Sequence, residues 1–226
     1  MSAIATLNHN SREILISAKL YFYGNESSDD LARRIVQEIN EMYNQPNVAT
    51  ERDKQHYQVR FEVKYELVYG DALVQLAIHN QDFTANFIRL EKQNYTTRSF
   101  MGFGLGDNAG HWITSDNLGT STTAAHEFGH GLGLDHPPYT DLRDLLTAPP
   151  IMAPRGTWVQ PPYQWSPEVA AGEYGGTLNP SHRKVSAAEV SEVVENLAFS
   201  SSGVAFIGKL SNTLFDEMGN PLRWLA

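Results

Sequence analysis

The chain has 226 residues, of which 41% are hydrophobic and 19% are charged, and its formal net charge is -9. This length suits a single domain with a packed core, and the acidic balance argues against nucleic acid as a partner. Cysteine is absent, which excludes disulfides, thiolate metal sites and cysteine nucleophiles. No stretch approaches the ~20 apolar residues of a membrane span, so we expect no membrane insertion.

The first part of the chain predicts a strand, a helix and a second strand. No basic start followed by an apolar run and a cleavage site is present at the N-terminus, so we expect no signal peptide in this chain. Residues 13–24 are apolar and β-branched and predict a buried strand. Residues 27–46 begin with helix-capping side chains and continue with apolar residues at helical spacing, which predicts an amphipathic helix. Residues 57–67 alternate apolar and polar side chains, as a half-buried strand does.

Weaker strand patterns follow at 73–80, 86–93, 99–104 and 111–116. A final helix is predicted from Ser186, which forms a capping-box pattern with Glu189, and a turn at 219–221 separates one or two short strands in the tail. This order of strands and helices indicates a mixed sheet with helices packed on it.

The stretch "HEFGHGLGLDH" carries the chemistry that stands out most in the sequence. His126 and His130 lie four residues apart and share one face of a helix, so both imidazoles can reach one Zn²⁺. Gly133 can take a positive φ that ends the helix, which lets His136 return to the metal. Glu127 lies round the helix, where it can reach a metal-bound water as a general base. The spacing predicts three zinc ligands and one base.

This stretch resembles the zinc signature of the metzincin metalloproteases, and Met152 in "PPIMAP" stands where metzincins place a methionine turn under the zinc. A proline two residues after the methionine resembles the matrixins, whereas "LGLDHPPY" is more similar to the serralysins. Astacins and serralysins have a metal-binding tyrosine where this chain has Pro154, and the calcium repeats that follow serralysin catalytic domains are missing. The likeness therefore indicates metzincins without a subfamily.

The resemblance implies an α+β fold: a twisted mixed sheet with a backing helix and an active-site helix, then a smaller irregular subdomain with the methionine turn and one helix. We expect one catalytic domain over residues 1–226, with an N-terminal subdomain at 1–136 and a C-terminal subdomain at 137–226. The implied activity is that of a secreted, extracellular zinc endopeptidase that cleaves protein or peptide substrates with a metal-activated water. We expect it to be a monomer.

The aromatic-rich region after the signature holds three candidates for the wall of a substrate pocket, although a plain core or rim role is equally open: Tyr139, Trp158 and Tyr163. Four loop carboxylates could bind Ca²⁺, but no calcium motif supports this, and solvated carboxylates are the favoured interpretation: Asp107, Asp116, Asp141 and Asp144.

A second function class stays open beside the peptidase. The chain could be a metal-bound, toxin-like or interaction module of a larger protein that performs no generic proteolysis. Chelator-sensitive cleavage of casein or quenched peptides distinguishes the two hypotheses.

Overall fold

The computed structural model describes residues 1–222, and the last four residues lie outside it. The described strands are β1 (Ala3–Asn8), β2 (Glu13–Tyr23), β3 (Ala49–Arg52), β4 (Gln55–Leu67), β5 (Ala85–Glu91), β6 (Phe100–Met101), β7 (Ala109–Ile113) and β8 (Val204–Ile207). The α-helices are α1 (Asp29–Asn44), α2 (Gly70–Ile78), α3 (Thr123–Leu132) and α4 (Ala187–Glu195). The chain therefore has the expected α+β class, and no described helix has the length and apolar character needed to cross a membrane.

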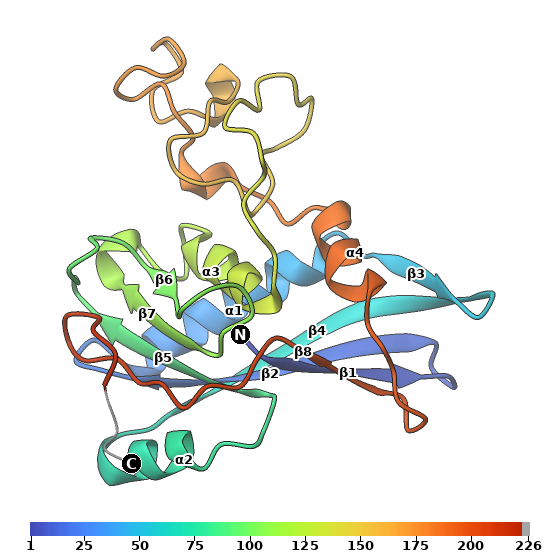
Figure 1. Ribbon diagram of the computed structural model, residues 1–226. Helices are drawn as coiled ribbons and strands as arrows, with labels where there is room; N and C mark the ends of the chain where they lie inside the picture. The colour runs from blue at the N-terminus through green and yellow to red at the C-terminus, as the bar shows by residue number, and fades with distance from the viewer. Residues whose placement is uncertain (223–226) are drawn as a thin grey trace.

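The strands form one curled, mixed sheet in the order β3-β4-β2-β5-β7-β6, with β1 between β2 and β8 (Figure 1). β2 is its centre, because it pairs in parallel with both β4 and β5 and antiparallel with β1. Residues 13–17 of β2 pair with β1, whereas residues 19–23 pair with β5. The sheet therefore branches along β2.

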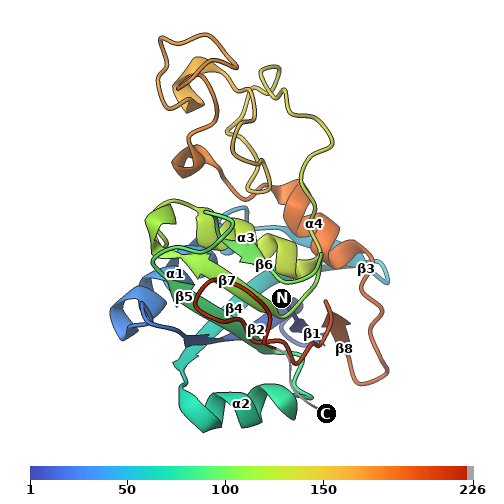
Figure 2. The same cartoon turned by 60° about the vertical axis from the view of Figure 1, so that its left-hand side comes forward.

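The two faces of β2 serve different layers. Ile14, Ile16 and Leu20 are fully buried in the main core, which lies under α1 and α3. Tyr21 and Tyr23 point to the other face, into a smaller cluster with residues of α2. Figures 1 and 2 show α2 on the side of the sheet opposite α1 and α3. The alternation of side chains along one strand thus builds both layers.

Two asparagines of α1 cover an edge of the sheet. β3 pairs only with residues 55–58 of β4, so the later part of β4 has a free side. Asn40 both donates to the carbonyl and accepts from the amide of Val63, and Asn44 does the same at Phe61, each bond at 2.9 Å. These side chains take the place of a neighbouring strand and leave less open edge for another chain to pair with.

The prediction of a strand at 73–80 is wrong, because residues 73–78 belong to α2 and the helix ends there. Gly70 has a φ of +59° and turns the chain out of β4, and Leu73 and Ala77 then lie one helical turn apart on the buried face. Short apolar runs do not distinguish a strand from a buried helix face. The strands predicted at 13–24, 57–67 and 86–93 are confirmed, as are the helices that begin after Ser28 and Ser186.

Residues 137–183 form an irregular lobe above α3, with short 3-10 turns at Pro161–Tyr163 and Pro180–His182 (Figures 1 and 2). The chain then returns to the main body, where β8 pairs antiparallel with β1. The expected C-terminal subdomain at 137–226 thus has two parts in the described residues, and its treatment as one subdomain stays a prediction. Its lobe stands apart, whereas its last strand completes the main sheet.

Candidate metal centre

Helix α3 presents its histidines to a cleft because its opposite face is buried. Phe128 is fully buried against Tyr43 of α1, with ring centroids 5.1 Å apart. Gly133 ends the helix with a φ of +99°, and its amide donates to the carbonyl of His130 at 3.1 Å. This left-handed residue reverses the chain as the sequence predicts. His136 comes back to the helix that it has just left.

The three histidine side chains converge on one point. The Nε2 atom of His136 lies 3.0 Å from Nε2 of His130 and 3.3 Å from Nε2 of His126. One nitrogen from each ring falls within 4.8 Å of the others, an arrangement that can hold a metal ion. Within residues 1–222 this is the one group of three or more potential metal-binding side chains that comes together.

The outer nitrogen atoms fix the orientation of two rings. Nδ1 of His126 lies 2.7 Å from the carbonyl of Ile151, and Nδ1 of His130 lies 3.0 Å from the carbonyl of Leu134. A carbonyl only accepts, so Nδ1 carries the proton and Nε2 keeps its lone pair. This backbone support is typical of metal-binding histidines.

Burial lowers the pKa of all three rings, that of His130 to about 4. Neutral imidazoles are the form that binds a metal. Two nitrogen ligands on a tetrahedral zinc ion, each at about 2.0–2.1 Å, lie roughly 3.3 Å apart. The separations of 3.0 and 3.3 Å fit that geometry. A bound cation can accept the lone pairs of all three Nε2 atoms at once, whereas a proton shared between two rings can interact with only two of them.

Glu127 lines the same cleft as the three histidines and is only 6% exposed. In residues 1–222 no protein group hydrogen-bonds to its carboxylate. Burial raises its pKa to about 8, and the nearby Arg183 guanidinium opposes this rise. A divalent cation at the histidines would also favour the charged carboxylate. The side chain is free to interact with a molecule that enters the cleft.

Met152 packs beneath α3, between the two helical metal-binding positions. It is 2% exposed, and a Cβ placed on Gly129 would come within 2.4 Å of its sulfur. The methionine lies in a tight turn in which the amide of Ala153 donates to the carbonyl of Pro150 at 3.0 Å. This methionine turn (residues 150–153) therefore packs against the helix that carries the histidines, where the soft side chain of Met152 fills the space left by Gly129.

One carboxylate of α4 holds the methionine turn. Glu189 accepts from the amides of Met152 at 2.9 Å and Ile151 at 3.3 Å. The same carboxylate accepts from the amide and hydroxyl of Ser186, both at 2.8 Å, and so completes the capping box of α4. The sequence predicts the role of Glu189 in the cap of α4. Its second role, anchoring the methionine turn, is visible only in the structure.

Glu189→Ala is expected to lower the free energy of unfolding by about 2–3 kcal/mol, because it leaves buried amide donors unsatisfied and removes the cap. Thermal or denaturant unfolding measures the loss. Exposed Glu192 on the same helix supplies the control Glu192→Ala, which should cost less than about 0.5 kcal/mol. Equal losses in the two variants would contradict the anchoring role.

The N-terminus of α3 is capped from α1. Its own N-cap residue, Thr122, has a φ of +65° and no capping side-chain bond. Glu38 supplies the acceptor instead, because its Oε1 atom accepts from the amide of Ala125 at 3.2 Å. Its other oxygen, Oε2, is buried with no partner among residues 1–222. Burial raises the pKa of Glu38 from 4.5 to about 6. The loss of solvation by water thus raises this pKa more than the hydrogen bond from Ala125 lowers it.

This raised pKa makes stability depend on pH with a defined sign. Below pH 4.5 Glu38 is neutral in both folded and unfolded chains, whereas above pH 6 its ionisation costs about 1–2 kcal/mol in the folded state. The wild type should therefore lose that much stability relative to Glu38→Gln as the pH rises through this window. Urea unfolding of both proteins at pH 4 and pH 7 measures the difference. A constant difference would show the prediction wrong.

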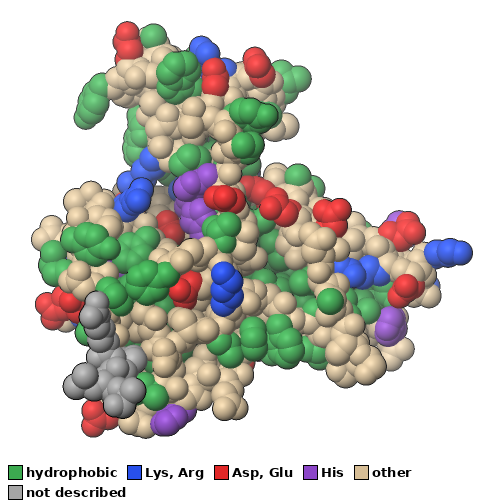
Figure 3. Space-filling view, in the orientation of Figure 1, with side chains coloured by type: hydrophobic (Ala, Val, Ile, Leu, Met, Phe, Trp, Pro, Cys, Tyr) green, Lys and Arg blue, Asp and Glu red, His purple; other side chains and the backbone are tan. Residues whose placement is uncertain are grey.

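The cleft between α3 and the lobe has a volume of about 360 Å³. Figure 3 shows histidine side chains reaching the surface at the base of the lobe, with basic side chains beside them. Besides the histidines and Glu127, its walls include three arginines, from the loop before β6, from the segment after the methionine turn and from the segment before α4: Arg98, Arg155 and Arg183. The sequence carries no local signal for them, because tertiary structure brings them together.

The three aromatic pocket candidates lie outside the lining of this cleft. Tyr139 is 72% exposed, and Trp158 stacks against the Arg143 guanidinium at 5.2 Å. Tyr163 packs in a small cluster inside the lobe. Their expected role in substrate binding therefore stays a prediction. Apart from the histidines and Glu127, the cleft is lined by Arg98, Ser99, Phe100, Met101, Gly104, Leu105, Asp116, Thr123, Pro154, Arg155 and Arg183.

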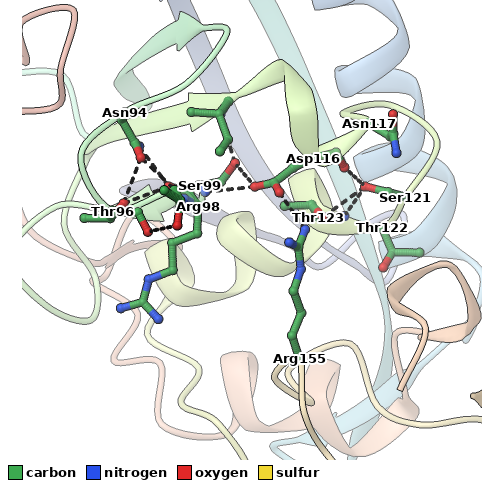
Figure 4. Close-up of polar contacts among 12 residues, drawn as sticks. Asn94, Thr96, Arg98, Ser99, Asp116, Asn117, Ser121, Thr122, Thr123 and Arg155 are labelled. Atoms are coloured by element: carbon green, nitrogen blue, oxygen red, sulfur yellow. Dashed lines mark hydrogen bonds and ion pairs between the residues drawn. The ribbon is translucent and has the colours of Figure 1, made fainter. Parts of the chain in front are cut away.

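Asp116 connects several polar groups in the cleft wall, and it is 5% exposed (Figure 4). It accepts from the amide and hydroxyl of Ser99 at 2.9 and 2.8 Å, and it forms an ion pair with Arg155 at 2.7 Å. Two other calcium candidates are also engaged: Asp107 with the amides of Phe103 and Ala109, and Asp141 with Arg143. The expectation of solvated carboxylates is therefore wrong for Asp107 and Asp116, which are buried, whereas Asp141 and Asp144 are exposed.

No model of a known protein family matches the chain, and no curated protein matches it either.

Proposed function

We propose that the chain is a zinc-dependent endopeptidase of the metzincin type. One observation carries the proposal: three neutral imidazoles converge at 3.0 and 3.3 Å in a cleft that also holds a carboxylate with no hydrogen-bond partner among residues 1–222. A ligand set of three histidines with an adjacent acid is the arrangement of a hydrolytic zinc site.

His126, His130 and His136 would hold the zinc ion, which when bound supplies a Lewis acid for a peptide carbonyl and lowers the pKa of its water. Glu127 accepts the proton of the attacking water and delivers it to the departing amine. The burial of Glu127 keeps bulk water from competing for that proton. The carbonyls of Ile151 and Leu134 hold two of the imidazoles in place during turnover.

Three features support the metzincin type beyond the signature. Gly133 takes the left-handed conformation that returns His136, and Met152 lies beneath the helix. Pro154, two residues after the methionine, lines the cleft but has no metal-binding atom in its side chain. Tyr163 and Tyr174 do not line the cleft, and Tyr174 is fully exposed. We therefore expect resting zinc with histidine and water ligands and no phenolate.

Incubation with casein and with a quenched-peptide library tests the proposal. The zinc-loaded chain should cleave peptides, a chelator should stop the cleavage, and added zinc should restore it. His130→Ala should be inactive under all three conditions, whereas His56→Ala, at an exposed position on β4, should match the wild type. A zinc-loaded chain that leaves a broad panel intact would favour the metal-bound interaction module instead.

A further inference from the structure

The cleft lining is rich in arginine although the chain as a whole is acidic. The protein has 17 lysines and arginines against 26 acidic residues, yet the cleft lining combines three arginines with only Asp116 and Glu127. Asp116 is already engaged by Ser99 and Arg155. The cleft wall therefore has unused positive charge next to the metal-binding histidines.

Arg183 is the most constrained of these cations. It is 2% exposed, its Nε atom donates to the hydroxyl of Thr122 at 2.9 Å, and its terminal nitrogen donates to the carbonyl of Ala153 at 3.2 Å. No carboxylate of residues 1–222 lies within ion-pair distance of it, and the nearby Glu127, Glu38 and Asp116 stabilise its charge only across a longer gap. A buried guanidinium is ordinarily paired with an acid, because its desolvation is costly.

Arg98 and Arg155 differ from Arg183 because solvent reaches both. Arg98 is exposed, and its guanidinium has no ion-pair partner in the described part of the chain. Figure 4 shows it extending from the loop before β6, while Arg155 rises from the lobe to Asp116. The Arg155 side chain is 50% exposed and gives Asp116 one of its nitrogens, so other donors stay available. The two guanidinium groups come from opposite sides of the cleft.

A planar guanidinium binds a carboxylate through two parallel hydrogen bonds, and a peptide carries its negative charge as carboxylates. Building on the proposed function, we propose that Arg98 and Arg155 bind a carboxylate of the substrate beside the scissile bond, with Arg183 supplying buried positive charge behind them. The carboxylate belongs to an aspartate or glutamate side chain or to the C-terminus of a short peptide. The preferred substrates are thus acidic peptides.

Matched quenched peptides test the charge preference. Each carries Glu, Gln or Lys at one position near the cut, and a second series compares a free C-terminus with its amide. We expect the wild type to prefer the peptide with the additional carboxylate by about tenfold or more in kcat/KM. A preference confined to the side-chain series assigns the carboxylate to Asp or Glu, and one confined to the other series assigns it to the C-terminus.

Variants connect that preference to the two arginines. In Arg98→Gln and Arg155→Gln the ratio should fall toward one, and Arg98→Glu should favour the Lys peptide. Arg60→Gln is the matched control, because Arg60 is exposed on β4 and does not line the cleft. Equal rates for Glu and Gln peptides in the wild type, or a preference that all these variants retain, would overturn the proposal.

A binding measurement keeps this test separate from the proposed activity. Fluorescence anisotropy of labelled Glu and Gln peptides on the Glu127→Gln protein needs no cleavage. The expected result is a tighter Kd for the acidic peptide that Arg98→Gln abolishes. If no peptide is cleaved but this difference is present, the peptidase proposal fails and the carboxylate site stands. If peptides are cleaved and bound without regard to charge, the carboxylate site fails and the peptidase proposal stands.

Discussion

Glu127→Gln is expected to lower kcat for peptide cleavage about a thousandfold, within the range that general acid–base catalysis contributes. The carboxylate lines the cleft, is 6% exposed and has no hydrogen-bond partner within residues 1–222, so little of the fold depends on its charge. Glutamine is nearly the same size but cannot accept a proton at neutral pH. The loss should therefore fall on the chemical step.

Two measurements separate this loss from damage to the site. Metal analysis should still find one zinc ion per chain, because the three imidazole ligands are unchanged. The melting temperature should stay the same or rise, since burial disfavours the charged carboxylate that the substitution removes. Glu192→Gln, on the exposed face of α4, should keep full activity. A Glu127→Gln protein with wild-type kcat would exclude the general-base mechanism.

The convergence of the three histidines could be predicted from the sequence because it depends on local geometry. His126, His130 and His136 lie within eleven residues, so helix geometry and one left-handed glycine determine where they point. The position of Met152 under the helix did not follow from spacing alone. That prediction rested on the family resemblance, and the structure places the sulfur of Met152 against Gly129.

The walls of the cleft could not be predicted, because they depend on contacts between distant segments. Arg98 and Arg155 line the same cleft from loops that lie 57 residues apart in the sequence, 98 to 155. No periodic pattern marks such residues, whereas aromatic side chains attract attention by their composition. Tyr139 and Trp158 were candidates on that basis, yet they lie outside the lining. Composition identifies a region that can hold a site but does not indicate which side chains face it.

The two buried acids, Glu38 and Glu189, show a second limit of sequence reasoning. Each lies on a helix away from the signature and accepts from a backbone amide: Glu38 at the start of α3 and Glu189 at the methionine turn. Helical periodicity describes Glu38 as a polar position and Glu189 as a cap. Their contacts with α3 and with the methionine turn become visible only in three dimensions.

Zinc is expected to raise the melting temperature by about 10 °C without being required for folding. The main core includes Tyr43, Phe128 and Met152, which pack together without any metal contact. The histidines already converge in this packed structure, so a metal binds the folded chain and stabilises it by mass action. Free zinc at a thousand times its Kd adds about 4 kcal/mol, which is about 8–16 °C for a chain of this size.

Circular dichroism with and without chelator measures both parts of this prediction. The chelated protein should keep its far-UV spectrum at 25 °C and melt earlier, because the sheet and α1 have a core of their own. His130→Ala should show little shift on zinc addition, since it removes one of three ligands, whereas His56→Ala should shift like the wild type. A chain that unfolds when chelated would show that the metal organises the fold. An undiminished zinc shift in His130→Ala would place the metal elsewhere, because two remaining imidazoles bind zinc far more weakly than three.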